Sequence, residues 1–243
     1  MATDSGQLLD QPVTGTRRTR GERLFLWGAC AAVLVVLVGF APTYYLKAFF
    51  ADRALSPLVH VHGLIMTTWF ATFFAQVWLV ESGNVRVHRK LGIFGVSLAV
   101  LILVIGTTTA IVAAHNGASP GPPPLVFLAI PLGDMLVFGT LVALAVAYRK
   151  RGDFHKRYML MASLGILTAA IARIPFLAPG GLPLFFGLTD LIVLGFVFTD
   201  TMGKRRLHPA FAVGLVVIIG SQVARFLIAG TPAWLEFAGW LAQ

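Results

Sequence analysis

The chain has 243 residues, of which 57% are hydrophobic and 12% are charged, with a formal net charge of +9. Its mean hydropathy of +0.82 excludes an ordinary soluble domain, in which about a quarter of the residues are charged. The apolar residues fall in runs of roughly 20, the length that crosses about 30 Å of hydrocarbon. The basic residues lie between these runs, so membrane topology and anionic lipid explain the charge better than nucleic acid does.

The apolar runs predict an all-α, polytopic membrane protein with seven transmembrane helices. The segment 1–22 is polar and without apolar periodicity, so we expect a disordered basic tail there. A seven-helix domain is predicted for 23–230, and an outer interfacial helix for 231–243, where Trp234, Phe237 and Leu241 share one helical face. The expected spans are 24–46, 57–80, 91–114, 124–147, 158–178, 183–202 and 209–229.

The distribution of lysine and arginine predicts the orientation in the membrane. The tail and the connections 81–90, 148–157 and 203–208 are rich in basic residues, whereas the connections 115–123 and 179–182 contain none. Cytoplasmic loops carry the excess of lysine and arginine. The N-terminus is therefore expected inside and the C-terminus outside.

Ionisable side chains inside the spans are costly to expose to lipid, so each marks a candidate functional site. From the helical rise, Asp134 lies about 15 Å below the outer surface and Asp190 about 10 Å below it. Pro131 and Pro175 interrupt the backbone hydrogen bonding beside this layer, which is tolerated where the chain lines protein or a cavity. We predict an outward-facing pocket that binds a cofactor through His60, His62, Asp134, Arg173, Asp190 and Arg225.

A structural interpretation of the same residues remains open. Asp134 with Arg173, and Asp190 with Arg225, are candidate ion pairs that would hold helices together. Arginines near helix ends also reach the headgroups with their long side chains.

His60 and His62, which are two residues apart, are the best candidates for binding a metal ion or haem. On a helix these two side chains point about 200° apart, so they do not comfortably share one ion. A haem held by two histidines would need a partner from another span. His115 is on the same side of the membrane but lies in a loop.

Three further histidines lie in the basic connections on the inner side. Three imidazoles at one depth are a possible metal site, but their arginine and lysine neighbours repel cations and favour anionic headgroups or an anionic partner. The residues predicted to meet lipid headgroups or a partner are His88, Arg89, Lys90, His155, Lys156, Arg157 and His208.

The sequence contains no phosphate loop, no His-Glu-x-x-His and no Gly-x-Ser-x-Gly motif, and we assign no catalytic residue. The stretches His60-Val-His-Gly63, Gly83-Asn-Val-Arg-Val-His-Arg-Lys-Leu-Gly92 and Phe154-His-Lys-Arg-Tyr-Met-Leu-Met161 resemble uncharacterised bacterial multi-pass membrane proteins, some of which are linked to cytochrome oxidase assembly. The resemblance implies the bacterial inner (plasma) membrane and an association with respiration.

Three hypotheses follow from these observations. In the first, the protein is redox-associated and binds haem, a metal ion or quinone in the outer pocket. In the second, it is an accessory or assembly subunit whose partners are other membrane subunits. In the third, it is a small-solute or proton-coupled transporter that uses Asp134 and Asp190.

Overall fold

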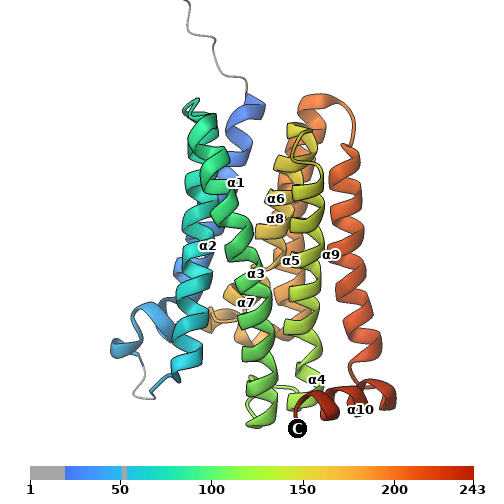
Figure 1. Ribbon diagram of the computed structural model, residues 1–243. Coiled ribbons are helices and arrows are strands. Elements are labelled where there is room, and N and C mark those ends of the chain that lie inside the picture. Colours follow the sequence, from blue (N-terminus) through green and yellow to red (C-terminus); the bar gives the residue numbers. More distant parts are fainter. Residues whose placement is uncertain (1–19, 51–53) are drawn as a thin grey trace, which may run out of the picture.

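The computed structural model describes residues 20–50 and 54–243. These residues form helices and turns with no β-strand among them, as the predicted all-α class requires. The long helices stand side by side as a bundle, and a short helix lies across one end (Figure 1). The helices are α1 (Arg20–Phe40), α2 (Pro57–Glu81), α3 (Val85–His115), α4 (Pro124–Phe127), α5 (Ala129–Ala147), α6 (Gly152–Gly165), α7 (Thr168–Ile171), α8 (Gly181–Lys204), α9 (Pro209–Ile228) and α10 (Pro232–Leu241). A π-helical turn (Ala41–Tyr45) and two 3₁₀ turns (Lys47–Phe49 and Pro175–Gly180) complete them.

Within the described residues, six helical segments are long and apolar enough to cross a membrane. The chain therefore has the helices of a multi-pass membrane protein. The expected span at 158–178 has no counterpart among these six segments, because its chain is divided into α6, α7 and part of a 3₁₀ turn. The six segments are Arg23–Tyr45, Pro57–Glu81, Val85–His115, Pro124–Ala147, Pro175–Lys204 and Pro209–Ile228.

The chain between α5 and α8 is interrupted twice, and local residues explain both breaks. α6 ends at Gly165, a weak helix former that packs closely on α9: an added Cβ would lie 3.2 Å from Cδ1 of Ile218. After this break, the Thr168 hydroxyl bonds that of Thr189 on α8 at 2.9 Å. α7 then stops before Pro175, because proline disfavours helix at the preceding residue and cannot donate a backbone hydrogen bond.

The interrupted segment occupies the centre of the bundle. Its apolar side chains Leu160, Met161, Leu164 and Leu167 are each 0% exposed. α6 packs against α1, α5, α8 and α9. Irregular backbone inside a membrane-type bundle is tolerated where protein surrounds it. The burial of this segment therefore explains how an interrupted helix fits among the spans.

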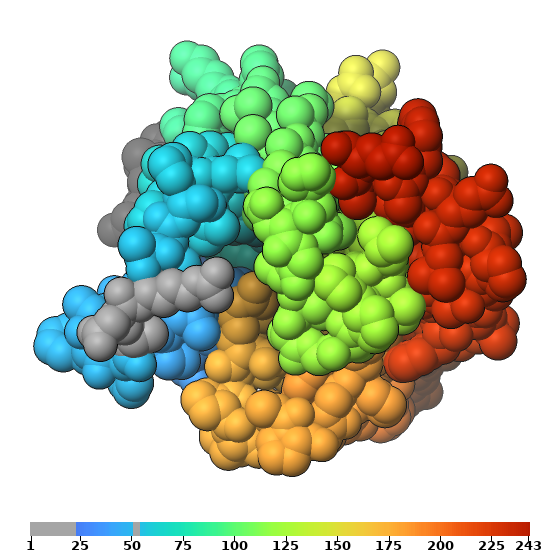
Figure 2. Space-filling view, turned by 90° about the horizontal axis from the view of Figure 1, so that it is seen from below, coloured from blue at the N-terminus to red at the C-terminus, as the bar shows by residue number. Residues whose placement is uncertain are grey.

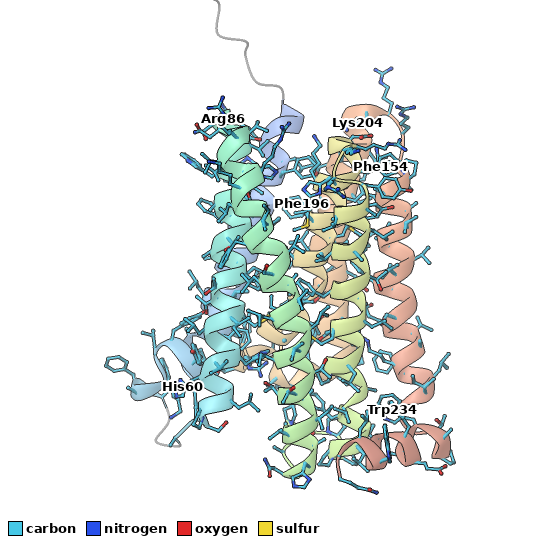
Figure 3. The ribbon with its side chains drawn as sticks, viewed as in Figure 1. His60, Arg86, Phe154, Phe196, Lys204 and Trp234 are labelled. Atoms are coloured by element: carbon cyan, nitrogen blue, oxygen red, sulfur yellow. The ribbon has the colours of Figure 1, made fainter. Side chains whose placement is uncertain are left out.

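The two ends of the bundle differ in character. Arg86 and Lys204 lie at one end, and His60 and Trp234 lie at the other (Figure 3). The start of α1 and the C-terminus also lie at opposite ends (Figure 1). We call the end with Arg86 and Lys204 the basic end.

Three boundaries differ from the sequence-based expectations. Residues 1–19 of the expected tail lie outside the described residues, and α1 already begins at Arg20, inside the range expected to be disordered. α3 begins at Val85, so the connection expected at 81–90 shrinks to 82–84, and His88 lies in a helix. The fourth span breaks at Leu128, three residues before Pro131, whose missing N–H leaves the helix without a bond there.

The C-terminal helix α10 lies within the range expected for an interfacial helix. It crosses the end of the bundle beside α4 (Figure 1). Nε1 of Trp234 donates to the carbonyl of Leu125 at 2.9 Å, which fastens α10 to α4.

Candidate functional site

Asp134 of α5 and Arg225 of α9 form a buried ion pair, with Nη1 2.6 Å from Oδ1. Nε and Nη2 of the arginine also contact the Ser221 hydroxyl at 3.1 and 3.0 Å. The guanidinium lies against Gly133, where an added Cβ would be 2.7 Å from Cζ. Asp134 therefore pairs with Arg225, and the expected pairing with Arg173 is wrong because α5 faces α9 at this level.

Asp190 of α8 lies beside this pair but binds an amide. It is half-buried and accepts a hydrogen bond from Nε2 of Gln222 at 3.0 Å. Cζ of Arg225 lies 5.4 Å from the ring centroid of Phe186, one turn before Asp190. The expected pair of Asp190 with Arg225 is therefore replaced by a bond to Gln222, and the three predicted residues meet between α5, α8 and α9.

Arg173 and His62 form a second group, away from the two acids. Nη1 of Arg173 donates to the carbonyl of Ala169 at 2.6 Å, and its Cζ lies 4.6 Å from the ring centroid of Phe40. His62 of α2 is half-buried and lies within electrostatic range of Arg173. The six residues predicted as one layer are thus divided between two parts of the bundle.

The outer histidines have separate surroundings. His60 is exposed, and its ring centroid lies 5.9 Å from that of Tyr44, whose hydroxyl donates to the His60 carbonyl at 3.2 Å. Nδ1 of His115 bonds the carbonyl of Ala242 at 2.7 Å. His60 and His115 therefore contact different parts of the chain, which does not favour a haem held between two outer histidines. In the described part of the chain, no group of three or more His, Cys, Asp or Glu side chains has the arrangement of a metal site.

The outer end of the bundle is hollowed between α2, α3 and the segment after α7 (Figure 2). We call this hollow the outer recess. His62 and Arg173 belong to two of the elements that border it. Trp69 follows His62 by seven residues on α2, so both lie on one helical face, about 10 Å apart along the axis.

Trp69 contributes a buried donor on this face. The residue is 2% exposed, and its ring meets Phe138 of α5 edge to face, with centroids 4.8 Å apart. Its Nε1 has no hydrogen-bond partner among the described residues. A buried donor without an acceptor costs about 1–3 kcal/mol, so an acceptor on a bound molecule would stabilise this site.

At the basic end, His88 of α3 and His155 of α6 meet edge to face, with ring centroids 6.3 Å apart. Nδ1 of His155 donates to the carbonyl of Ala145 at 2.8 Å. With its amide oriented to suit all its neighbours, Gln76 donates to Nδ1 of His88 at 2.8 Å and accepts from the N–H of Gly92 at 2.9 Å. His88 thus carries its proton on Nε2. A metal-bound histidine donates through its other nitrogen, so this tautomer does not suit a metal ligand.

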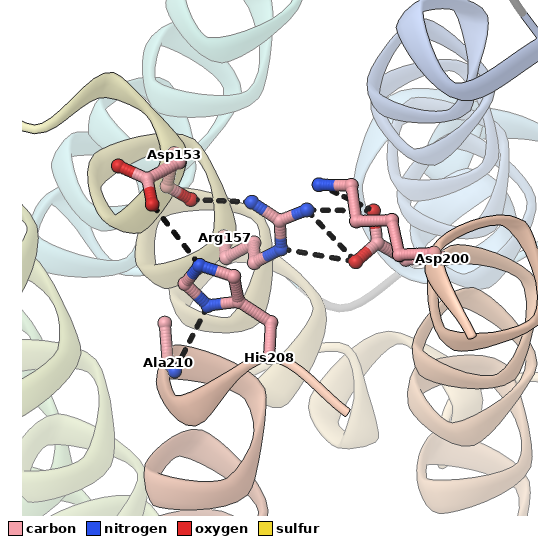
Figure 4. Close-up of polar contacts among 6 residues, drawn as sticks. Asp153, Arg157, Asp200, His208 and Ala210 are labelled. Carbon is pink, nitrogen blue, oxygen red and sulfur yellow. Dashed lines mark hydrogen bonds and ion pairs between the residues drawn. The ribbon is translucent and has the colours of Figure 1, made fainter. Parts of the chain in front are cut away.

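His208 lies apart from this pair and caps α9. Its Nδ1 accepts from the N–H of Ala210 at 3.1 Å, and its Nε2 donates to Oδ2 of Asp153 at 3.2 Å (Figure 4). This pattern is that of a neutral imidazole. Partial burial lowers the pKa of His208; the bond to Asp153 opposes this shift, and the nearby Arg157 guanidinium adds to it. Protonation would remove the cap and place charge at the positive end of the helix dipole.

We expect the protein to lose stability as the pH falls below about 6.5, the ordinary pKa of histidine. The pKa of folded His208 is lowered, so the unfolded chain binds the proton first and the stabilisation present above that pH is lost on acidification. Partial burial raises the pKa of Asp153, but the hydrogen bonds from His208 and from backbone N–H groups outweigh this effect and hold that pKa below its ordinary value. Asp153 therefore extends the same trend below about pH 4.

The melting temperature of the detergent-solubilised protein, measured between pH 7.5 and 5, tests this expectation. His208→Asn retains a capping oxygen and does not titrate. We expect this variant to depend less on pH than the wild type in that interval. An unchanged slope would assign the pH dependence to other groups.

A second buried ion pair joins Arg157 of α6 to Asp200 of α8 (Figure 4). Nε donates to Oδ2 at 3.1 Å, Nη2 donates to Oδ1 at 2.7 Å, and Nη1 donates to the carbonyl of Asp153 at 2.6 Å. Arg157 is 0% exposed. Its expected role in a headgroup-binding loop does not fit this position, because α6 begins at Gly152 and turns the side chain into the bundle.

The remaining residues expected to meet headgroups fall into two sets. His88, His155 and His208 bond within the protein, as described above. Arg89, Lys90 and Lys156 are exposed, and their contact with headgroups stays a prediction.

Among residues 20–50 and 54–243, these contacts give one candidate ligand site, in the outer recess, and two buried ion pairs that join helices. The polar groups of His62, Trp69 and Arg173 are hydrogen-bond donors rather than a nucleophile with an adjacent base, which favours binding over covalent chemistry. Comparisons with protein-family models, with curated proteins and with solved structures find no match to this chain, so its function is argued from these contacts.

Proposed function

We propose that this chain is a multi-pass protein of the bacterial plasma membrane, associated with redox processes, that binds a quinone-class ligand in the outer recess. The observation that carries the proposal is the buried N–H of Trp69, which has no acceptor among the described residues. It lies on the same face of α2 as His62. Ligand sites are mostly apolar with a few placed polar groups, and a quinone supplies an apolar ring with oxygens that only accept.

The proposal includes an orientation, with the N-terminus inside and the C-terminus outside. Arg86 and Lys204 share one end of the bundle (Figure 3), and the positive-inside rule assigns such an end to the cytoplasm. The interrupted segment through α6 and α7 then supplies the seventh crossing. The outer recess, with His62 and Arg173, opens on the opposite side.

Quinone suits the recess better than a metal ion or haem does. His62 and Arg173 are donors on two elements that border the recess, and Trp69 carries a further donor about 10 Å along α2 from His62. The transporter alternative uses Asp134 and Asp190, but Asp134 is paired with the guanidinium of Arg225 and Asp190 is bonded to the amide of Gln222, which favours a structural role for both acids.

Titration calorimetry with a short-chain quinone tests the proposal on purified protein. We expect saturable binding that His62→Ala and Trp69→Phe each weaken about tenfold, because each removes one hydrogen bond at a partly or fully buried position. The phenylalanine keeps most of the ring, so packing against Phe138 is retained.

Two matched variants control for general damage to α2. His60→Ala removes the exposed neighbouring imidazole, and Trp78→Phe removes an indole that is 55% exposed on the same helix. Both are expected to bind quinone as the wild type does. A wild type that binds no quinone, or equal losses in controls and test variants, would contradict the proposal. Co-purifying membrane subunits in that case would favour the accessory-subunit alternative.

A further inference from the structure

Charged side chains gather between α6 and α8 at the basic end, against Phe25 of α1. Asp200 is bound by Arg157 through two nitrogens and lies 3.5 Å from Nζ of Lys204. Nζ of Lys156 lies 4.6 Å from the ring centroid of Phe25 and makes no ion pair with any described residue. We call Lys156, Arg157, Asp200 and Lys204 the inner basic cluster.

The inner basic cluster has more positive than negative charge. The cluster has three cations and one carboxylate, and a further carboxylate that acts on Lys156, that of Asp153, is bonded to His208. Burial of part of the side chain lowers the pKa of Lys156, and repulsion from Arg157 and Lys204 lowers it further, against a weaker attraction from Asp200 and Asp153. The cluster therefore favours an additional anion.

Two of the three cations are exposed and can reach that anion. Arg157 is enclosed and fixed by Asp200 and by the carbonyl of Asp153. The Lys204 side chain is 43% exposed, and Lys156 is exposed as well. Lys204 can turn from Asp200 at little cost, because Arg157 still neutralises that carboxylate.

We propose that Lys156 and Lys204 bind a phosphate group, supplied by the headgroup of an anionic phospholipid, between α1, α6 and α8. α1 and α8 both belong to segments with the length and apolarity of membrane spans, and Lys204 lies at the basic end (Figure 3). Basic pockets between such helices on the cytoplasmic side suit anionic headgroups. This site is independent of the outer recess, which lies at the other end.

Lipid-dependent thermal stabilisation of the purified protein in mild detergent tests the site. We expect phosphatidylglycerol to stabilise the wild type and phosphatidylcholine to have little effect. In Lys156→Gln/Lys204→Gln the apparent affinity for phosphatidylglycerol should fall at least tenfold, since each lysine near a membrane surface attracts anionic lipid appreciably. Lys156→Arg/Lys204→Arg keeps both charges and should retain the response.

A second double variant separates this site from diffuse surface charge. Arg89→Gln/Lys90→Gln removes the same number of charges from the same end, on α3, and should respond to phosphatidylglycerol as the wild type does. Equal losses in both glutamine variants would overturn the proposal. Inorganic phosphate at millimolar concentration forms a third arm: stabilisation equal to that by the lipid would show that free phosphate, rather than a headgroup, is the ligand and would overturn the lipid assignment.

Discussion

Replacing Asp200 with alanine is expected to destabilise the protein by about 3–5 kcal/mol, the range for removing one partner of a buried ion pair. The variant leaves the guanidinium of Arg157, which is 0% exposed, without its carboxylate. The remaining hydrogen bond to the carbonyl of Asp153 does not neutralise the charge. Because native stabilities are typically about 5–15 kcal/mol, we expect a large drop in the yield of monodisperse protein and in its melting temperature.

Two further variants separate loss of the buried pair from loss of any charge at Asp200. Lys204→Ala removes the partner whose side chain is 43% exposed, and we expect a change of about 0–1 kcal/mol, typical of exposed pairs. The double variant Arg157→Met/Asp200→Leu replaces both buried charges with apolar groups, which is often neutral or stabilising. It should recover much of the melting temperature lost in Asp200→Ala. A double variant as unstable as Asp200→Ala would show that the position, rather than the unpaired charge, determines stability.

The fold follows from the sequence wherever a helix is long and uniformly apolar. α2 and α9 lie close to their expected bounds, because apolar length and a proline at the start of each helix both point to the same limits. The central segment is harder to predict. Its breaks depend on the close approach of Gly165 to Ile218 and on a bond between Thr168 and Thr189, and neither contact is visible in local sequence.

Pairing between distant helices explains most of what the sequence could not provide at the site. Asp134 and Arg225 are 91 residues apart, and charge and depth alone match Asp134 equally well with Arg173. Only the packing of α5 against α9 selects the pair. The burial of Arg157 could not be predicted for a different reason: this residue ends a basic run that resembles a surface loop.

The spacing of polar groups on α2 is a signal that the sequence does contain. His62, Trp69 and Gln76 follow each other at intervals of seven residues, so they lie in one line on the helix. In the structure, His62 belongs to an element that borders the outer recess, Trp69 is buried with a donor that has no partner among the described residues, and Gln76 bonds His88. An indole in line with two polar side chains indicates which face of a span lies toward the protein interior. The number of apolar residues in the span does not give this information.

Replacing Gly133 with alanine is expected to disrupt the buried pair of Asp134 and Arg225 without changing any charge. The new Cβ would lie 2.7 Å from Cζ and 2.8 Å from Cδ of Arg225, and closer still to Nε. The guanidinium must then move away from Asp134, and the buried position leaves neither group access to water. We expect a loss of about 3 kcal/mol or more, as for breaking a buried pair. Replacing glycine with alanine in a helix interior otherwise stabilises by roughly 0.5–1 kcal/mol. A loss of stability would therefore indicate the clash with Arg225, and a gain would indicate that there is none.

Gly220 of α9 provides the matched control, since an added Cβ there meets no atom within 4 Å. Gly220→Ala should leave the melting temperature unchanged or raise it slightly. The steric origin is tested by repeating Gly133→Ala in an Asp134→Leu/Arg225→Met background, where neither the pair nor the guanidinium is present. Neighbouring substitutions that act through one contact are not additive, so the penalty of Gly133→Ala should shrink sharply in that background. A penalty of undiminished size would mean that alanine at this position disturbs the packing of α5 itself, rather than the bond between Asp134 and Arg225.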